Sequence, residues 1–331
     1  MKKWSPPKGY KPLGFLRALK AGYLKRPQSI RALKGAVYRP RSIKIRISKC
    51  KMSIQNTQAK EIIFLNGKFL KASEARLSVL EPGFLYGWGL FETMRAYNGK
   101  IVYFNQHLQR IKNSCRLLGM VFPHSLVSIK EIIKKAVAKN GFRGVYVRLT
   151  LWKCEKGTDI LVTVRKYKPY SSGKYRKGFC ACVSSFRQNE NSYLTRLKTT
   201  NYLLYRLALR EAEKKGFDEA LILNQKGYIA EASRSNLFLI KDKEIFTPSL
   251  ECGCLNGITR RVVLDLAKKN NMKVYEGNFT IENLLAADGA FLTNSLMGIM
   301  PLTSLEKITI GKNKCLGLIK FFIKKYNSLF R

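Results

Sequence analysis

The first regular pattern in the chain is an alternation of apolar and polar residues over 61–70, interrupted by Asn66-Gly67. Such an alternation around Asn-Gly predicts a β-hairpin. Leu108, Ile111, Cys115 and Leu118 then follow at helical spacing, and the glycine at 119 is a natural place for that helix to stop. Further elements expected in this part are a helix over 126–139 and strands over 145–151 and 160–164. Together they predict a small α+β domain, which we assign to residues 52–167.

A polar segment, Lys168-Pro-Tyr-Ser-Ser-Gly-Lys174, separates this domain from the rest of the chain. Its proline, glycine and serines predict a linker over 168–175. A helix over 202–215 that stops at Gly216 is expected beyond it. The other elements expected there are strands over 219–223, 228–232, 237–240 and 290–293 and a helix from 257 to about 269. These elements predict a larger domain over 176–331.

The chain is long and apolar enough to bury a substantial core, since it has 331 residues of which 46% are hydrophobic. No apolar run approaches the roughly 18 residues that a membrane-spanning helix requires. Residues 316–325 are amphipathic, and such a helix more often covers a globular domain than lies on a membrane. No membrane partner is therefore expected.

The charge is strongly positive, because 62 Lys and Arg outnumber 21 Asp and Glu, which gives +41. Residues 1–51 hold 16 of the basic residues and no acidic one, so the remainder carries 46 − 21 = +25. Many of the lysines follow helical spacing, which is typical of solvated faces. A nucleic-acid-binding protein would also need a recognisable module of stacking aromatic residues, which is missing here. We expect a small anionic substrate and no nucleic acid.

Residues 1–51 have no sustained hydrophobic period and no signal-peptide pattern. Three interpretations stay open: a region upstream of the true start at Met52, a basic disordered tail, or a targeting segment. The first two are favoured equally. We expect no catalytic residue in this extension.

Eight cysteines include Cys180-Ala-Cys182 and Cys252-Gly-Cys254, but the chain has only two histidines. A structural zinc site needs four closely placed ligands, so no metal is expected. Without a signal peptide or a disulfide-framework spacing, free thiols in a reducing cytoplasm are the better interpretation.

Three segments carry candidate chemistry: 196–202, which contains Lys198; 231–236, which opens with Glu231; and 255–260, which contains Gly257 and Thr259. A lysine amine can form a Schiff base with an aldehyde cofactor. A carboxylate can keep the ring nitrogen of such a cofactor protonated. A helix that begins at a glycine offers unpaired N–H groups to a phosphate. The ordered set predicts a site for a phosphorylated aldehyde cofactor.

The same segments resemble the class IV aminotransferase family, the pyridoxal-phosphate enzymes of fold type IV. The resemblance covers about 62–305, and its motifs are Phe64-Leu-Asn-Gly67, Gly83–Arg95, His107-Leu-Gln-Arg110, Lys198-x-x-Asn201, Glu231-x-x-x-x-Asn236, Gly257-Ile-Thr259 and Thr293–Pro301. It implies an α+β fold of two domains, the larger being α/β and barrel-like. It also implies bound pyridoxal 5′-phosphate and a homodimer.

The resemblance also implies roles for individual residues. Lys198 would be the catalytic lysine that binds the cofactor and moves the substrate proton. Glu231 would face the ring nitrogen, although an edge-strand charge is the alternative. The other cofactor-binding positions implied are Arg95, Tyr202, Gly257, Ile258, Thr259 and Thr293. Three of these have ordinary alternatives: a surface pair with Glu92 for Arg95, the apolar face of a helix for Tyr202, and a plain helix start for Thr259.

Substrate contacts are implied less strongly, at Tyr86, Thr93, Asn256 and Asn294. Two departures from the family pattern are Trp88, where many members have Asp, and Lys153, near where many have Arg-Gly; the second leaves the substrate-carboxylate contact open. The Asn-Gly-Ile and Asn-Ser-Leu-Met segments are most similar to those of the family's 4-amino-4-deoxychorismate lyases, which form 4-aminobenzoate and pyruvate on the way to folate. A transaminase of branched-chain or D-amino acids with 2-oxoglutarate is the alternative.

Overall fold

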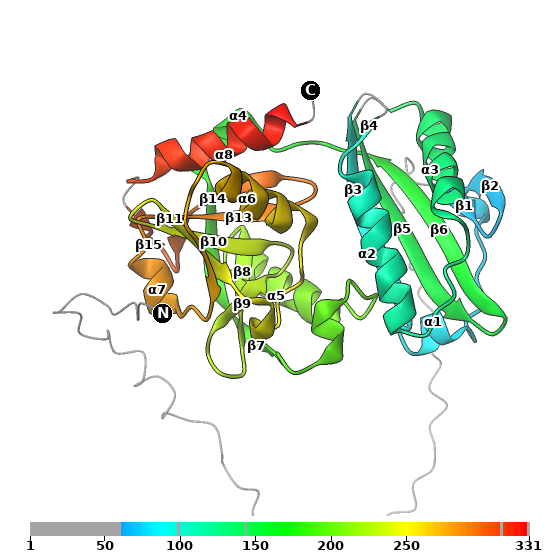
Figure 1. The fold of residues 1–331 in the computed structure, drawn as a ribbon. Helices are drawn as coiled ribbons and strands as arrows, with labels where there is room; N and C mark the ends of the chain where they lie inside the picture. Colours follow the sequence, from blue (N-terminus) through cyan, green and yellow to red (C-terminus); the bar gives the residue numbers. More distant parts are fainter. Residues whose placement is uncertain (1–60, 98–99, 143, 312–313, 330–331) are drawn as a thin grey trace, which may run out of the picture. The chain divides into compact units, whose positions relative to one another are not determined.

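The computed structural model describes residues 61–331 except 98–99, 143, 312–313 and 330–331. The expectations for residues 1–51 lie outside this range. Within it the chain forms two sheets, one of six strands before residue 167 and one of nine strands after residue 178 (Figure 1).

The first sheet is antiparallel throughout, in the order β2-β1-β6-β5-β3-β4. Its strands are β1 Ile62–Leu65, β2 Lys68–Lys71, β3 Gly89–Tyr97, β4 Lys100–Ile101, β5 Gly144–Cys154 and β6 Gly157–Lys166. The expected hairpin is confirmed, since β1 and β2 pair around Asn66 and Gly67, both with positive φ (44° and 93°). Positive φ at both central residues gives the turn a twist that matches the two strands.

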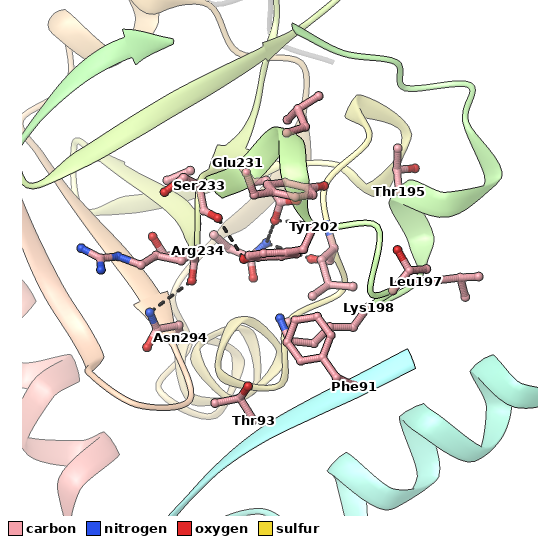
Figure 2. Close-up of a pocket in the computed structure, with 18 of the residues that line it drawn as sticks. Phe91, Thr93, Thr195, Leu197, Lys198, Tyr202, Glu231, Ser233, Arg234 and Asn294 are labelled. Atoms are coloured by element: carbon pink, nitrogen blue, oxygen red, sulfur yellow. Dashed lines mark hydrogen bonds between the residues drawn. The ribbon is translucent and has the colours of Figure 1, made fainter. Parts of the chain in front are cut away.

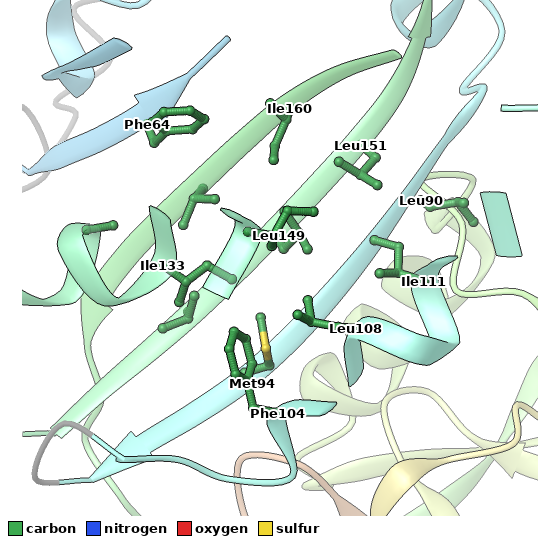
Figure 3. Close-up of a cluster of buried hydrophobic side chains, with 14 of the residues drawn as sticks. Phe64, Leu90, Met94, Phe104, Leu108, Ile111, Ile133, Leu149, Leu151 and Ile160 are labelled. Carbon is green, nitrogen blue, oxygen red and sulfur yellow. The ribbon is translucent and has the colours of Figure 1, made fainter. Parts of the chain in front are cut away.

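Two helices, α2 Phe104–Leu117 and α3 Leu126–Asn140, cover one face of this sheet (Figure 1). Both confirm the helical spacing in the sequence, and Gly119 after α2 has a left-handed φ of 62°. Their apolar side chains meet those of the sheet in one buried cluster, shown in Figure 3 with Leu108, Ile133 and Leu149. Full burial of each such side chain contributes about 1.5–3 kcal/mol, so the cluster fixes α2 against β3.

The second sheet is mixed, in the order β12-β11-β10-β13-β14-β7-β8-β9, with β15 paired to β14. Its strands are β7 Phe179–Gln188, β8 Glu219–Asn224, β9 Ile229–Ala232, β10 Asn236–Lys241, β11 Glu244–Pro248, β12 Val274–Gly277, β13 Gly289–Asn294, β14 Gly298–Leu305 and β15 Ile308–Thr309. β7 runs parallel to both of its neighbours, β14 and β8. Such parallel pairs need long connections, and the one from β7 to β8 carries Lys198 and α5 Leu203–Lys214.

Helices α6 Ile258–Lys269 and α8 Leu316–Ser328 pack on each other and on β13. Phe238 and Phe291 stack at 5.0 Å between ring centroids, and Phe322 of α8 lies 5.7 Å from Phe291. The amphipathic segment at 316–325 is therefore a helix that covers the second sheet. Two shorter helices are α1 Pro82–Leu85 and α7 Ile281–Leu285.

The expected linker at 168–175 is only partly irregular. Helix α4, Ser172–Lys177, occupies its second half, and the Ser171 hydroxyl caps it by accepting from the N–H of Lys174 at 3.1 Å. A serine that can satisfy a free N–H at a helix start favours a helix over an open loop. The domain limits at 52–167 and 176–331 stay predictions.

Candidate active site

A cavity of about 500 Å³ is lined by residues from both sheets. Phe91 and Thr93 of β3 and Arg148 of β5 come from the first sheet, while Lys198 and Glu231 come from the second half of the chain. Figure 2 shows the lysine beside Phe91, with Tyr202 and Glu231 nearby. The cavity therefore gathers three of the segments that the sequence marked for chemistry.

Lys198 is held by backbone pairing with β3. Its C=O accepts from the N–H of Phe91 at 2.8 Å, and Thr199 forms a bridge with Leu90. The Nζ atom lies 4.6 Å from the centroid of the Phe91 ring. Burial lowers the pKa of Lys198 to about 8, and the nearby Arg110 cation acts in the same direction. A buried amine of this kind can be neutral and nucleophilic near neutral pH.

Glu231 lies on β9, an edge strand of the second sheet, yet it is buried. Its carboxylate accepts from the hydroxyl of Tyr205 at 3.2 Å, the N–H of Leu255 at 3.3 Å and Nδ2 of Asn236 at 3.4 Å. Burial raises the pKa of Glu231 to about 7, although the Leu255 N–H and the Lys198 cation oppose that shift. The surface-charge alternative does not fit a carboxylate so enclosed, whereas a partner with an N–H⁺ does.

Tyr202 faces the cavity just before α5 begins. Its hydroxyl donates to the C=O of Ser233 at 2.9 Å, and its ring meets Phe91 edge to face at 5.4 Å. It also stacks on Tyr205 at 4.8 Å. Tyr202 therefore lies in the cavity wall and not on the apolar face of a helix.

The start of α6 supplies a candidate anion site. Gly257 is the N-cap, and the cavity is lined by Gly257, Ile258 and Thr259. Across the wall, Thr293 Oγ1 is buried and has no hydrogen-bond partner among the described residues. Free N–H groups at a helix start and an unpaired hydroxyl are what a phosphate group needs. The residues present therefore fit the phosphate end of the expected cofactor.

Arg95 is not among the lining residues of the described cavity, and its role in cofactor binding stays a prediction. Its guanidinium lies over the Tyr167 ring at 5.0 Å and donates to the C=O of Leu296 at 3.4 Å. It does not pair with Glu92, which binds Arg110 instead at 2.6 Å. Side chains 92 and 95 of a strand point to opposite faces, which explains the difference. Leu296 belongs to the segment that follows Thr293, so Arg95 lies behind the cavity wall.

The four weaker substrate positions divide into two pairs. Thr93 and Asn294 line the cavity. Tyr86 is 72% exposed and lies outside the wall, and Asn256 is also outside the lining, with its C=O bound to Arg110 at 2.9 Å. A role for these four residues in substrate binding stays a prediction.

Sequence reasoning missed Arg148 and Tyr146, which both line the cavity from β5. The Arg148 guanidinium lies 3.7 Å from the Phe91 ring centroid, and its Nε donates to Thr150 at 3.2 Å. Alternation along this strand places both residues on the face opposite the apolar core, a signal that was available in the sequence. Lys153, which stands near the position where many family members have Arg-Gly, is not among the lining residues.

Two further residues that the sequence did not indicate, Tyr205 and Gln188, hold Glu231 through a chain of hydrogen bonds. Gln188 Nε2 donates to the Tyr205 hydroxyl at 2.6 Å and to the C=O of Gly253 at 3.2 Å. The hydroxyl in turn donates to Glu231. The three residues are far apart in sequence, so no local pattern could join them.

Within the described ranges, no group of three or more His, Cys, Asp and Glu is arranged to hold a metal ion. The seven cysteines of those ranges are all free thiols. None of the helices there is long and apolar enough to cross a membrane.

Known proteins match this chain in family and in fold. The family model for amino-transferase class IV matches residues 89–305. The aminodeoxychorismate lyase of Bacillus subtilis is 32% identical over 262 residues, which are 76% of this chain and 88% of that protein. The branched-chain-amino-acid aminotransferase of Pseudomonas aeruginosa is also 32% identical, over 76% of this chain and 87% of its own length.

Among solved structures, the T.th. branched-chain amino acid aminotransferase with pyridoxamine 5′-phosphate superimposes with a TM-score of 0.75. The two are 30% identical, and the match covers 82% of this chain and 95% of that one. The expected α+β fold of type IV is thereby confirmed, as is pyridoxal 5′-phosphate as the cofactor of these enzymes. The chain belongs to the class IV aminotransferase family of pyridoxal-phosphate enzymes.

Proposed function

We propose that this enzyme is a 4-amino-4-deoxychorismate lyase, which releases pyruvate and leaves 4-aminobenzoate. The observation that carries the proposal is the charge of the cavity wall. Its described lining contains five arginines and a single carboxylate, Glu231. Arg110 and Arg234 form ion pairs with Glu92 and Glu219, which leaves Arg148, Arg187 and Arg206 to meet an anionic substrate. A substrate with two carboxylates suits such a wall. Because 2-oxoglutarate, the second substrate of the alternative transaminase, is also a dicarboxylate, the product assay below separates the two reactions.

The lyase of Bacillus subtilis and the branched-chain aminotransferase of Pseudomonas aeruginosa are each 32% identical to the chain. A class IV transaminase that acts on branched-chain or D-amino acids with 2-oxoglutarate is therefore the second candidate. The apolar rings of Phe91, Tyr146 and Tyr202 in the cavity wall favour it, because they suit an aliphatic side chain.

The roles of the residues follow from their positions. The bound cofactor supplies an aldehyde for the substrate amine and an electron-withdrawing ring. Gly257, Ile258 and Thr259 at the start of α6 and the hydroxyl of Thr293 would hold its phosphate. Glu231 would hold a proton on the ring nitrogen. Arg148, beside Phe91 and across from Thr93 in the sheet, is suited to a substrate carboxylate.

Lys198 would move the proton. Its amine removes the proton from the ring carbon that bears the substrate nitrogen. The bond from the neighbouring carbon to the enolpyruvyl oxygen then breaks, and the six-membered ring becomes aromatic. The leaving enolpyruvate takes up a proton and becomes pyruvate, so atoms and charges balance. In a transaminase the same lysine would still carry the substrate proton, but no bond to an enolpyruvyl oxygen would break.

We also infer a homodimer, as the family resemblance implied. Large apolar residues are exposed along one segment: Leu77, Val79, Leu80, Phe84, Leu85, Tyr86 and Trp88. Exposed patches of this kind commonly mark protein interfaces. Light scattering of the purified enzyme should give twice the chain mass, and Phe84→Asp should reduce it to one chain. The free thiols of the described residues suit the reducing cytoplasm in which we expect the enzyme to work.

A product assay separates the two reactions. With 4-amino-4-deoxychorismate we expect 4-aminobenzoate and pyruvate in equal amounts, and only slow conversion of the cofactor to its amine form by L- and D-amino acids. Arg148→Gln should raise the KM for the dicarboxylate while the folded protein stays intact. Rapid conversion of the cofactor by branched-chain or D-amino acids, without 4-aminobenzoate, would establish the transaminase instead.

A further inference from the structure

Three side chains at the cavity wall form a hydrogen-bonded group to which the proposed reaction gives no chemical step. Glu92 of β3 accepts from both ends of the Arg110 fork, at 2.6 Å from Nε and 2.7 Å from Nη2. His107 Nδ1 lies 2.6 Å from the same carboxylate. Glu92 and His107 are each 1% exposed. We call these residues the Glu92–His107–Arg110 triad.

The proton positions in the triad follow from chemistry. Burial alone would raise the pKa of Glu92, but the Arg110 and His107 partners hold it at about 2, so the carboxylate is ionised and can only accept. Nδ1 of His107 must therefore carry the hydrogen. Burial lowers the pKa of His107 and so favours the neutral ring, in which Nε2 is an acceptor for the Ser295 hydroxyl 3.3 Å away.

Each of the two donors of the triad also touches a segment of the second half of the chain. The remaining arm of Arg110, Nη1, donates to the C=O of Asn256 at 2.9 Å, and Asn256 directly precedes the helix start at Gly257. Nε2 of His107 lies 3.3 Å from the Ser295 hydroxyl, two residues after Thr293. One carboxylate on β3 thus positions two groups that reach both candidate phosphate-binding segments.

We propose that the Glu92–His107–Arg110 triad positions the two segments that bind the cofactor phosphate, the helix start at Gly257 and the segment from Thr293 to Leu296. Its members are positioning residues, because they would act on the phosphate through Asn256 and Ser295. The inference rests on the cofactor of the family and is independent of whether the enzyme is a lyase or a transaminase.

The geometry requires an arginine. Three nitrogens of one planar guanidinium satisfy Glu92 twice and the Asn256 carbonyl once. A lysine keeps the charge but is a single point donor and cannot hold both partners in fixed positions. Arg110→Lys therefore tests whether the phosphate needs the fixed hydrogen bonds of the guanidinium or only a positive charge nearby.

The test compares two ligands that differ only in the phosphate. Cofactor-free protein is titrated with pyridoxal 5′-phosphate and with pyridoxal, and the ratio of the two dissociation constants is measured. For Arg110→Lys we expect the preference for the phosphorylated ligand to fall about tenfold or more, since a hydrogen bond with a charged group is worth at least this factor. For His107→Asn, which loses a contact between neutral groups, we expect a several-fold fall. Pyridoxal affinity should stay within about twofold.

His107→Asn is informative because an asparagine can replace Nδ1 toward Glu92 but does not reach Ser295. Ser295→Ala removes the same contact from the other side and should lower the preference several-fold, while Ser295→Thr keeps the hydroxyl and should restore it. Arg116→Lys, an exposed change on the same helix α2, is the matched control and should leave the ratio unchanged.

Two results would overturn the proposal. Equal losses of affinity for both ligands would mean that the triad supports the fold alone. An unchanged ratio in Arg110→Lys would mean that only the charge of Arg110 matters. If Arg110→Lys fails to fold, His107→Asn and the two Ser295 variants decide the question alone. The aminobenzoate assay is separate, so an unchanged ratio rejects the triad without touching the proposed reaction.

Discussion

Lys198 lies against the Phe91 ring at 4.6 Å and near the Tyr202 ring at 5.6 Å. Because no other lysine lines the described cavity, Lys198→Ala should abolish turnover and covalent attachment of the cofactor after borohydride reduction. Mass spectrometry of the reduced protein measures the attachment. Lys241→Ala, which removes a distant partner of Asp288, is the control. A cofactor still fixed to the Lys198 variant would reject the assignment.

Glu231 should determine how well the cofactor ring accepts electrons. Without a carboxylate at the ring nitrogen, turnover should fall at least about a hundredfold while folding survives. Glu231→Ala and Glu231→Gln, compared by kcat and by thermal unfolding, measure this. Near-normal kcat in either variant would contradict the role.

The lowered pKa of Lys198 predicts a pH dependence. A lysine whose pKa is depressed from 10.5 to about 8 becomes a neutral amine as pH rises through 8. The rate at which cofactor-free protein captures pyridoxal 5′-phosphate covalently should therefore rise with pH around a midpoint near 8. Stopped-flow absorbance across pH 6–11 measures it, and a midpoint above about 10, the range of an exposed lysine, would show that burial leaves the amine unperturbed.

Many of the residues that line the cavity could be predicted from the sequence, and those that could not share a physical cause. Lys198, Glu231, Thr259 and Thr293 stand in ordered motifs, and all of them line the cavity. Tyr205 was not predictable because its role depends on a contact with Glu231 that only the fold creates. The alternative interpretation of Arg95, a surface pair with Glu92, was wrong because strand β3, which carries both residues on opposite faces, was not predicted.

At the scale of elements, the start of α6 depends on the absence of a side chain at Gly257. A Cβ there would collide with Oδ1 of Asn236, whose amide also holds Glu231 and the Leu255 carbonyl. Gly257→Ala should therefore weaken cofactor binding at least about tenfold by displacing a buried, hydrogen-bonded side chain. Equilibrium titration of cofactor-free protein measures the loss.

Gly317→Ala provides the matched control, because a Cβ in that first turn of α8 meets open space. It should leave cofactor affinity unchanged and raise stability by up to about 1 kcal/mol. Equal effects of both alanines on cofactor affinity would show that the contact at Asn236 is unimportant.

Local signals account for the elements that the sequence predicted. Asn66-Gly67 and the apolar spacing of α2, α3, α5 and α6 depend on neighbours in sequence. Strand β3 was not predicted because Glu92 occupies a core-facing position between Leu90 and Met94, which hides the alternation. That charge is tolerated only because α2 brings Arg110 to it. Strand β14 was not predicted either, because it contains Pro301 and proline is uncommon inside strands.

At the scale of the whole molecule, the motifs and the described cavity all lie beyond Met52. A chain that starts at Met52 should therefore keep full activity, and the acid-free composition of residues 1–51 supports this. Activity, solubility and cofactor content of the two forms measure it. An inactive or insoluble short form would make the extension part of the fold or of the site.

Tyr326 of α8 is 2% exposed, and its hydroxyl lies 3.4 Å from Thr259 Oγ1 at the start of α6. An affinity tag or immobilisation linker fused directly after α8 would lie close to a helix that contacts the start of α6, where we propose that the cofactor phosphate binds. Purification and surface-attachment handles are therefore better placed ahead of Met52, since every residue that lines the described cavity comes later in the chain.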